Sequence, residues 1–233
     1  MGAQRDGAFS EYITMPIERI YDGKGLNPKQ LALIEPFCIS YHGVSRADVK
    51  KGDKVLVIGA GTIGVLAAIA AKAKGGEVYI VDVAEEKLQY AYETFGLAGM
   101  IKNDSEEEFM NRVNEITGEH HGFDVCIEAV GLPSTFQNCI DAAAYGGRIV
   151  LIGVGKKNLD FNFTLIQKKE LNIFGSRNAL KADFTELIDL VKNGEIDLEK
   201  IVMNPDSTDV KKKSEYELDE ADRAFEEFSK YGG

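Results

Sequence analysis

The chain has 233 residues, with 27 Lys and Arg against 38 Asp and Glu, and therefore a formal net charge of −11. At 44% hydrophobic and 28% charged residues, its composition is that of a folded globular protein and excludes a disordered chain. The net negative charge would repel the phosphate backbone of a nucleic acid, and every cluster of Lys and Arg has Asp or Glu residues close to it in the sequence. We therefore expect no nucleic-acid partner.

Cysteine usage and hydropathy indicate where the protein works. Cys38, Cys126 and Cys139 are too far apart for a zinc knuckle or a disulfide framework, which favours a reducing, cytoplasmic location. The uncharged run at residues 55–71 is at the short limit for a membrane span, and the glycines inside it favour a strand, a turn and a helix instead. The first seven residues have no apolar core, so we expect neither a signal peptide nor membrane association.

The hydrophobic pattern of residues 1–46 predicts one strand and one helix. The strand-like pattern covers residues 8–13, and an apolar helix runs from about Pro28 to Val44. On this helix we interpret His42 as a hydrogen-bonded packing residue and Cys38 as a core residue.

A regular alternation of strands and helices follows. Strands are predicted at residues 55–58, 77–82, 100–101, 123–129, 148–153 and 171–175, and helices at residues 63–74, 85–95, 105–116 and 133–144. Ser105 and Glu108 have the spacing of a capping box, Pro133 suits a helix start, and Gly146-Gly147 predicts a turn before the fifth strand. Six strands joined by helical connections predict an α/β fold with a doubly wound parallel sheet in the order 3-2-1-4-5-6.

The residues after Arg177 do not continue the alternation. They predict helices and a polar loop at residues 204–214, which contains a solvated Lys run at 211–213. The last helix carries an apolar face that needs a surface to cover; its residues are Ala221, Ala224, Phe225 and Phe228. The chain therefore divides into residues 1–46, a central domain at 47–176 and a C-terminal segment at 177–233.

A glycine motif links the first strand of the central domain to its first helix. Gly59, Gly61 and Gly64 form G-x-G-x-x-G where the strand ends, and Asp82 ends the next strand 18 residues after Gly64. This is the fingerprint of a dinucleotide-binding Rossmann domain: the first glycine permits the turn, the second lets the pyrophosphate approach, and the third lets helix and sheet pack closely. The motif's remaining positions are Ala60, Thr62 and Ile63.

The acid after the second strand predicts the cofactor. Asp82 would accept hydrogen bonds from ribose hydroxyls, and Val83-Ala84 offers no Arg for a 2′-phosphate, so we expect NAD rather than NADP. Two alternatives stay open. One is a tight turn without a ligand, and the other is a methyltransferase, whose third glycine usually stands where this chain has Ile63.

Around the motif the chain resembles the medium-chain, zinc-type alcohol dehydrogenase family, in its branch of polyol, threonine and sugar-acid dehydrogenases. The matching segments run in family order: residues 7–12, 33–36, His42, 52–57, the glycine motif, 128–131, 147–150 and 175–178. The resemblance implies an NAD-dependent enzyme that transfers a hydride between nicotinamide and a secondary alcohol, and a homo-oligomer built through the edge strand at residues 171–175.

The same resemblance implies roles for single residues. Lys87 would contact the adenosine ribose, whereas Val130, Gly153 and Val154 would lie near the nicotinamide. Two further residues are Arg177, placed near the pyrophosphate or the floor of the active site, and Glu35, which stands at or beside the family's catalytic zinc.

Several family features have no counterpart in this sequence. It contains no Gly-His-Glu motif and no four-Cys cluster, and one carboxylate is too few for a zinc site, so we expect the chain not to retain zinc. His120-His121 is interpreted as a helix-end or loop feature. We therefore expect a chain that carries the cofactor-binding half of a dehydrogenase beside remnants of a catalytic domain; the alternative is a non-catalytic NAD-binding or interaction module. No catalytic residue is assigned.

Overall fold

The computed structural model describes residues 6–201 and 216–231. Its centre is one sheet of six parallel strands in the order β3-β2-β1-β4-β5-β6. The strands are β1 (Lys54–Ile58), β2 (Glu77–Asp82), β3 (Gly99–Lys102), β4 (Phe123–Glu128), β5 (Ala143–Leu151) and β6 (Asn172–Gly175). The predicted doubly wound α/β fold and the predicted strand order are confirmed.

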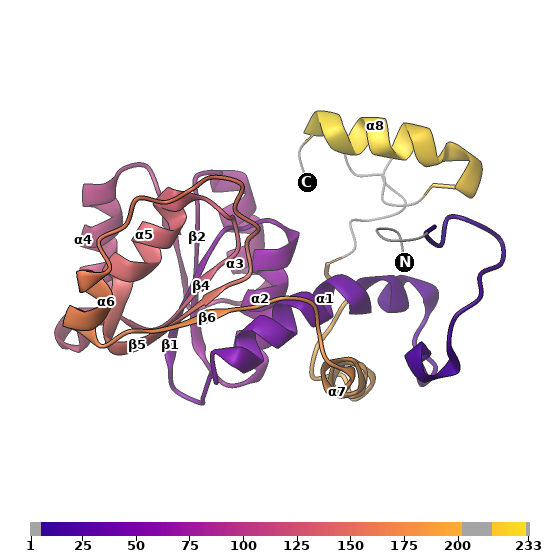
Figure 1. Cartoon of the computed structure of the whole chain (residues 1–233), viewed down its shortest axis with the longest axis horizontal. Coiled ribbons are helices and arrows are strands. Elements are labelled where there is room, and N and C mark those ends of the chain that lie inside the picture. The colour runs from indigo at the N-terminus through magenta and orange to yellow at the C-terminus, as the bar shows by residue number, and fades with distance from the viewer. Residues whose placement is uncertain (1–5, 202–215, 232–233) are drawn as a thin grey trace.

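Helices cover both faces of the sheet (Figure 1). One face packs against α1 (Pro28–Arg46), α2 (Thr62–Ala73) and α3 (Glu85–Phe95), and α7 (Lys181–Lys192) joins the same core through its contact with α1. The other packs against α4 (Glu106–Thr117), α5 (Pro133–Ala142) and α6 (Thr164–Lys169). Each central strand sends alternate residues into the two cores: in β1, Val55 and Val57 face α2, whereas Leu56 and Ile58 lie in the other core.

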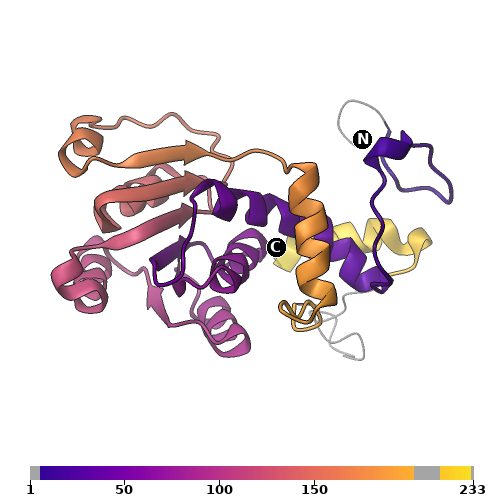
Figure 2. The same ribbon diagram turned by 90° about the horizontal axis from the view of Figure 1, so that it is seen from below.

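The long helix α1 extends from the sheet toward the N-terminal segment, and α7 crosses α1 (Figures 1 and 2). Asn27 and Gln30 form a capping box at its start, with Pro28 in the first turn. The segment before α1 also contacts α7, through the stacked rings of Tyr21 and Phe184, whose centroids lie 4.8 Å apart. The helix α8 (Ala221–Tyr231) lies apart from the sheet, over the N-terminal segment (Figure 1), where Phe225 meets Phe9.

Three 3-10 turns complete the described elements: Ile17–Arg19, Gly118–His120 and Leu218–Glu220. The predicted strand at residues 8–13 is wrong, because a strand requires a neighbour for its ladder and none of the described strands pairs with this segment, which is exposed. The predicted turn at Gly146-Gly147 is also wrong: both residues lie inside β5, which begins at Ala143 with a register irregularity against β4. Helix α6 was not predicted.

Other predictions fall outside the described residues. These are the polar loop at residues 204–214, the chain start and the side chain of Phe228. Across residues 6–201 and 216–231, no helix combines the length and the apolar character that crossing a membrane requires.

Candidate functional site

The site predicted from the sequence lies at the carboxyl ends of the parallel strands. β1 and β4 are neighbours at the centre of the sheet, and the connections leave them in opposite directions, to β2 and to β5. Such a switch point leaves a crevice between the two outgoing loops, where ligands of doubly wound sheets bind. The fold therefore predicts a crevice at this point, with the glycine turn after β1 on one side and the residues after β4 and β5 on the other.

The geometry of the glycine turn meets the demands of a phosphate cradle. Gly59 has φ +108°, a conformation that side chains disfavour. A Cβ on Gly64 would stand 1.8 Å from the carbonyl oxygen of Gly59, so helix and turn touch through bare backbone. A Cβ on Gly61, in contrast, would meet nothing within 4 Å. The turn is therefore tight on the protein side and open at Gly61, where α2 begins with unpaired N–H groups and the positive end of its dipole.

Asp82 stands at the end of β2 beside this turn. Its Oδ2 accepts a hydrogen bond from the Ala60 N–H at 2.7 Å, and its Oδ1 accepts one from the Ala84 N–H at 2.9 Å. The carboxylate thus holds the glycine turn, a role that the sequence did not indicate. Two carboxylate oxygens accept about four hydrogen bonds, so acceptor capacity remains for ribose hydroxyls.

The opposite wall consists of two loops pressed together through their backbones. A Cβ on Gly131 would lie 2.6 Å from the carbonyl carbon of Val154, and one on Gly153 would lie 2.3 Å from the Gly131 nitrogen. Val130 also packs against the glycine turn, because a Cβ on Gly59 would meet Val130 Cγ2 at 2.7 Å. Val130 is 41% exposed and Val154 is 83% exposed. The structure therefore brings Val130, Gly153 and Val154 together, facing the glycine turn.

Sequence reasoning missed Glu128, the last residue of β4. Its side chain is buried, with 3% exposure, and its Oε1 accepts hydrogen bonds from the N–H groups of Val130 and Gly131 and from the hydroxyl of Thr135. A carboxylate at the end of an apolar strand is the available signal, but only the fold shows that it points inward.

Two other predicted residues follow the carboxyl ends of β2 and β6. Lys87 is exposed in the first turn of α3, five residues after Asp82. Arg177 is exposed, two residues after β6. Their assignments to the adenosine ribose and the pyrophosphate stay predictions.

The helix α1 approaches the glycine turn from the other side. Ser40 is buried, and its hydroxyl donates to the carbonyl oxygen of Ile63 in the first turn of α2 at 2.7 Å. This contact places α1 beside the first turn of α2, and the exposed Glu35 lies about one and a half helical turns before Ser40 on the same helix.

The donor groups around Glu35 do not fit a zinc ion. Glu35 is exposed, whereas Cys38, three residues further along α1, is completely buried, and burial raises the pKa of its thiol to about 12. His42 Nδ1 lies 2.9 Å from Asp183 Oδ2 and is engaged in that contact. In residues 6–201 and 216–231, no group of three His, Cys, Asp or Glu residues is placed to hold a metal ion.

The adjacent histidines lie at the other end of the sheet. His120 closes a 3-10 turn and its Nε2 lies 2.8 Å from Asp124 Oδ1, whereas His121 has φ +56° and is exposed. They form part of the connection between α4 and β4, which is the loop interpretation made from the sequence.

Known dehydrogenases are similar to this chain in sequence. The family described as zinc-binding dehydrogenase matches residues 62–193. L-galactonate-5-dehydrogenase of Escherichia coli K12 is 36% identical over 196 residues, which are 84% of this chain and 57% of that protein. Sorbitol dehydrogenase of Halalkalibacterium halodurans is 29% identical over 97% of this chain and 63% of its own length. The chain therefore spans less than two thirds of the length of these relatives.

Solved structures agree with the sequence relatives. A short chain alcohol dehydrogenase from Escherichia coli CFT073, complexed with NADH, superposes with a TM-score of 0.85 at 26% identity, covering 98% of this chain and 64% of that one. A zinc-binding dehydrogenase from Sinorhizobium meliloti 1021, bound to NADP, superposes with a TM-score of 0.76 at 27% identity, covering 86% and 59%. Because the family match covers more than half of its residues, the chain belongs to the zinc-binding dehydrogenase family.

Proposed function

We propose that the chain binds NAD in the crevice between β1 and β4 and contributes the hydride-acceptor side of a dehydrogenase acting on a secondary alcohol. The observation that carries this proposal is the glycine turn, closed at Gly59 and Gly64 and open at Gly61, with Asp82 beside it. The names of the relatives, L-galactonate-5-dehydrogenase and sorbitol dehydrogenase among them, favour polyol, sugar-acid or threonine-like alcohols as substrates.

Each part of the crevice has a task in this proposal. The N-terminus of α2 faces the pyrophosphate with N–H donors, and Asp82 accepts from the adenosine ribose. Val130 and Val154 shield the nicotinamide from water with apolar side chains. The bound cofactor would accept the hydride from the alcohol carbon.

The proposal also includes a preference for NAD over NADP. The choice needs its own argument, because one structural neighbour was solved with NADH and another with NADP. Two neighbouring groups support NAD here. Asp82 would repel a 2′-phosphate, and the exposed Val83 that follows it offers no cation. The three buried, unpaired cysteines also fit work in a reducing compartment such as the cytoplasm.

Zinc belongs to the family, but the groups around Glu35 do not fit it, so we derive no step through the metal. We expect the purified 233-residue chain to bind NADH, to carry far less than one equivalent of zinc, and to show no turnover of sorbitol, threonine, galactonate or simple alcohols. Calorimetry with NADH, metal analysis and NADH absorbance measure these three properties. Absence of NADH binding would refute the proposal, and tight zinc with rapid turnover would show that the ligand set is misjudged.

The outer edge of β6 supports a further part of the proposal, a dimer. β6 pairs with β5 on one side, and no described strand pairs with its other side. Pairing with the same strand of a second copy would satisfy the free backbone groups of Asn172–Gly175. We expect a dimer mass by light scattering at micromolar concentration, and a monomer when Ile173 is replaced by Pro. A monomeric unaltered chain would contradict this assembly.

A further inference from the structure

The residue Glu128 joins every backbone segment on the far wall of the crevice. It ends β4, one of the two central strands, and its carboxylate is turned into the protein. The Oε1 atom accepts from the Val130 N–H at 3.0 Å, the Gly131 N–H at 2.8 Å and the Thr135 hydroxyl at 2.6 Å. One oxygen therefore orders the loop after β4 and ties it to α5.

The loop after β5 meets the same residue. The main-chain carbonyl oxygen of Glu128 accepts from the N–H groups of Ile152, at 2.9 Å, and Gly153, at 3.0 Å. The second carboxylate oxygen, Oε2, would lie 2.5 Å from a Cβ on Gly153, so only glycine lets this loop come so close. Both loops of the wall are thus fixed to Glu128, one through the side chain and the other through the main chain.

The partners of this carboxylate are N–H and O–H groups. Among the described residues, no ion pair includes Glu128, so amide and hydroxyl donors satisfy its charge. Hydrogen bonds to an ionised acceptor contribute more than neutral ones, and donors that lose a buried acceptor are costly. Removing the carboxylate would release the loop that presents Val130, and it would remove neither of the hydrogen bonds by which Asp82 holds the glycine turn.

We propose that Glu128 is a positioning residue for the nicotinamide half of the cofactor: it holds the loops after β4 and β5 so that Val130, Gly153 and Val154 form one preformed wall. This inference rests on the proposed binding of NAD. In this inference the glycine turn and Asp82 bind the adenosine half of the cofactor. The loops that Glu128 holds in place bind the nicotinamide half.

The test compares two ligands. NADH carries the nicotinamide ring, and ADP-ribose lacks it but keeps the adenosine and the pyrophosphate. In Glu128→Ala we expect the dissociation constant of NADH to rise about tenfold and that of ADP-ribose to change less than about twofold. The enhanced fluorescence of bound NADH, which reports the surroundings of the ring, should fall as well. Glu128→Gln keeps an acceptor oxygen and should restore most of the NADH affinity.

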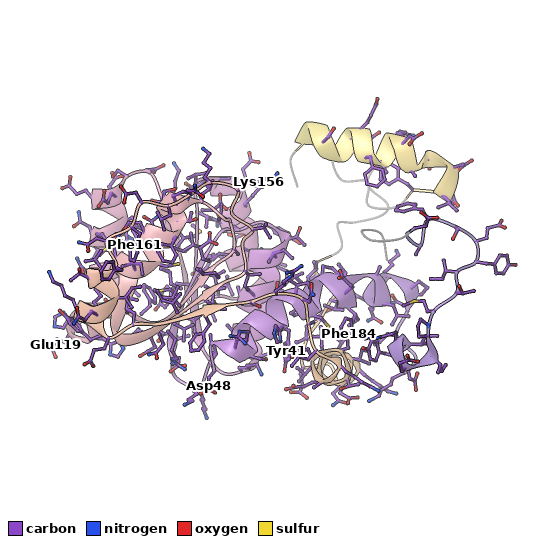
Figure 3. The ribbon with its side chains drawn as sticks, in the orientation of Figure 1. Tyr41, Asp48, Glu119, Lys156, Phe161 and Phe184 are labelled. Atoms are coloured by element: carbon purple, nitrogen blue, oxygen red, sulfur yellow. The ribbon has the colours of Figure 1, made fainter. Side chains whose placement is uncertain are left out.

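A control on the same strand separates positioning from stability. Asp124 begins β4 at the opposite end of the sheet, where its Oδ2 accepts the Lys54 N–H at 2.8 Å. Figure 3 shows this separation: Glu119, just before β4, and Lys156, just after β5, lie far apart. Asp124→Asn should lower the melting temperature without changing the ratio of NADH to ADP-ribose affinity.

The remaining outcomes are each decisive. If the unaltered chain binds neither ligand, the proposed function fails and this inference fails with it. If the unaltered chain binds both and Glu128→Ala weakens both equally, or neither, only the inference is overturned. Should Glu128→Ala not fold, Thr135→Val removes a single donor to Oε1 and should raise the NADH dissociation constant about threefold with ADP-ribose unchanged; an unchanged ratio in that variant refutes the inference.

Discussion

Gly64→Ala is expected to lower the stability of the fold by about 3 kcal/mol and to abolish measurable NADH binding. The added methyl group would lie 1.8 Å from the Gly59 carbonyl oxygen, so either α2 must move off the sheet or the turn must open. Thermal unfolding should show a melting temperature lowered by roughly 10 °C. Calorimetry on the cooled, folded protein measures the loss of binding.

Gly61→Ala is the matched control for this change. It adds the same methyl group at the second glycine of the motif. Nothing lies within 4 Å of that position, and the φ of −76° at Gly61 suits alanine. We expect an unchanged melting temperature, but a weaker affinity for NADH, because the methyl occupies the space left for the pyrophosphate. Equal destabilisation by the two substitutions would show that the close contact at Gly64 is not what makes glycine necessary there.

Asp82→Ala is expected to weaken NAD binding by about 10- to 100-fold and to narrow the difference between NAD and NADP. Loss of one charge-assisted hydrogen bond to the ribose costs about 1.5–3 kcal/mol, which is roughly this factor. The carboxylate also holds the Ala60 N–H in the turn. Removing it takes away the repulsion of a 2′-phosphate at the same time.

Titration calorimetry with both cofactors measures this change. Asp82→Asn serves as the control, since its amide oxygen can still accept the Ala60 N–H while the charge is gone. The asparagine variant should therefore keep the turn in place. Its affinity for NAD should lie between that of the unaltered chain and that of the alanine variant. Equal affinity of the unaltered chain for NAD and NADP would contradict the role given to Asp82.

The architecture could be predicted because each strand carries its own signal. Val55 to Ile58 form a continuous apolar run, which indicates a strand buried on both faces, and parallel strands with helical crossovers have few permitted topologies. The glycine turn was predictable for the same reason, because its three glycines form a local sequence pattern, G-x-G-x-x-G, directly after an apolar strand.

What could not be predicted depends on contacts between distant segments. The segment at residues 8–13 alternates like a strand, but strand formation is decided by a neighbour, which local sequence does not contain. His42 and Asp183 meet across 141 residues, and no local pattern announces that pair. Glu128 was visible in the sequence, yet its three donors come from the loop after β4 and from α5, which only the folded chain brings to its side chain.

The position of β1 in the middle of the sheet has a consequence for synthesis on the ribosome. β2 and β3 follow β1 closely, but its other neighbour is β4, and the paired residues Lys54 and Asp124 are 70 positions apart. At a translation rate of about 5–20 residues per second, β4 leaves the ribosome about 4 to 14 seconds after β1. During that interval β1, the most apolar strand of the nascent chain, is the open edge of a half-built sheet and a target for chaperones.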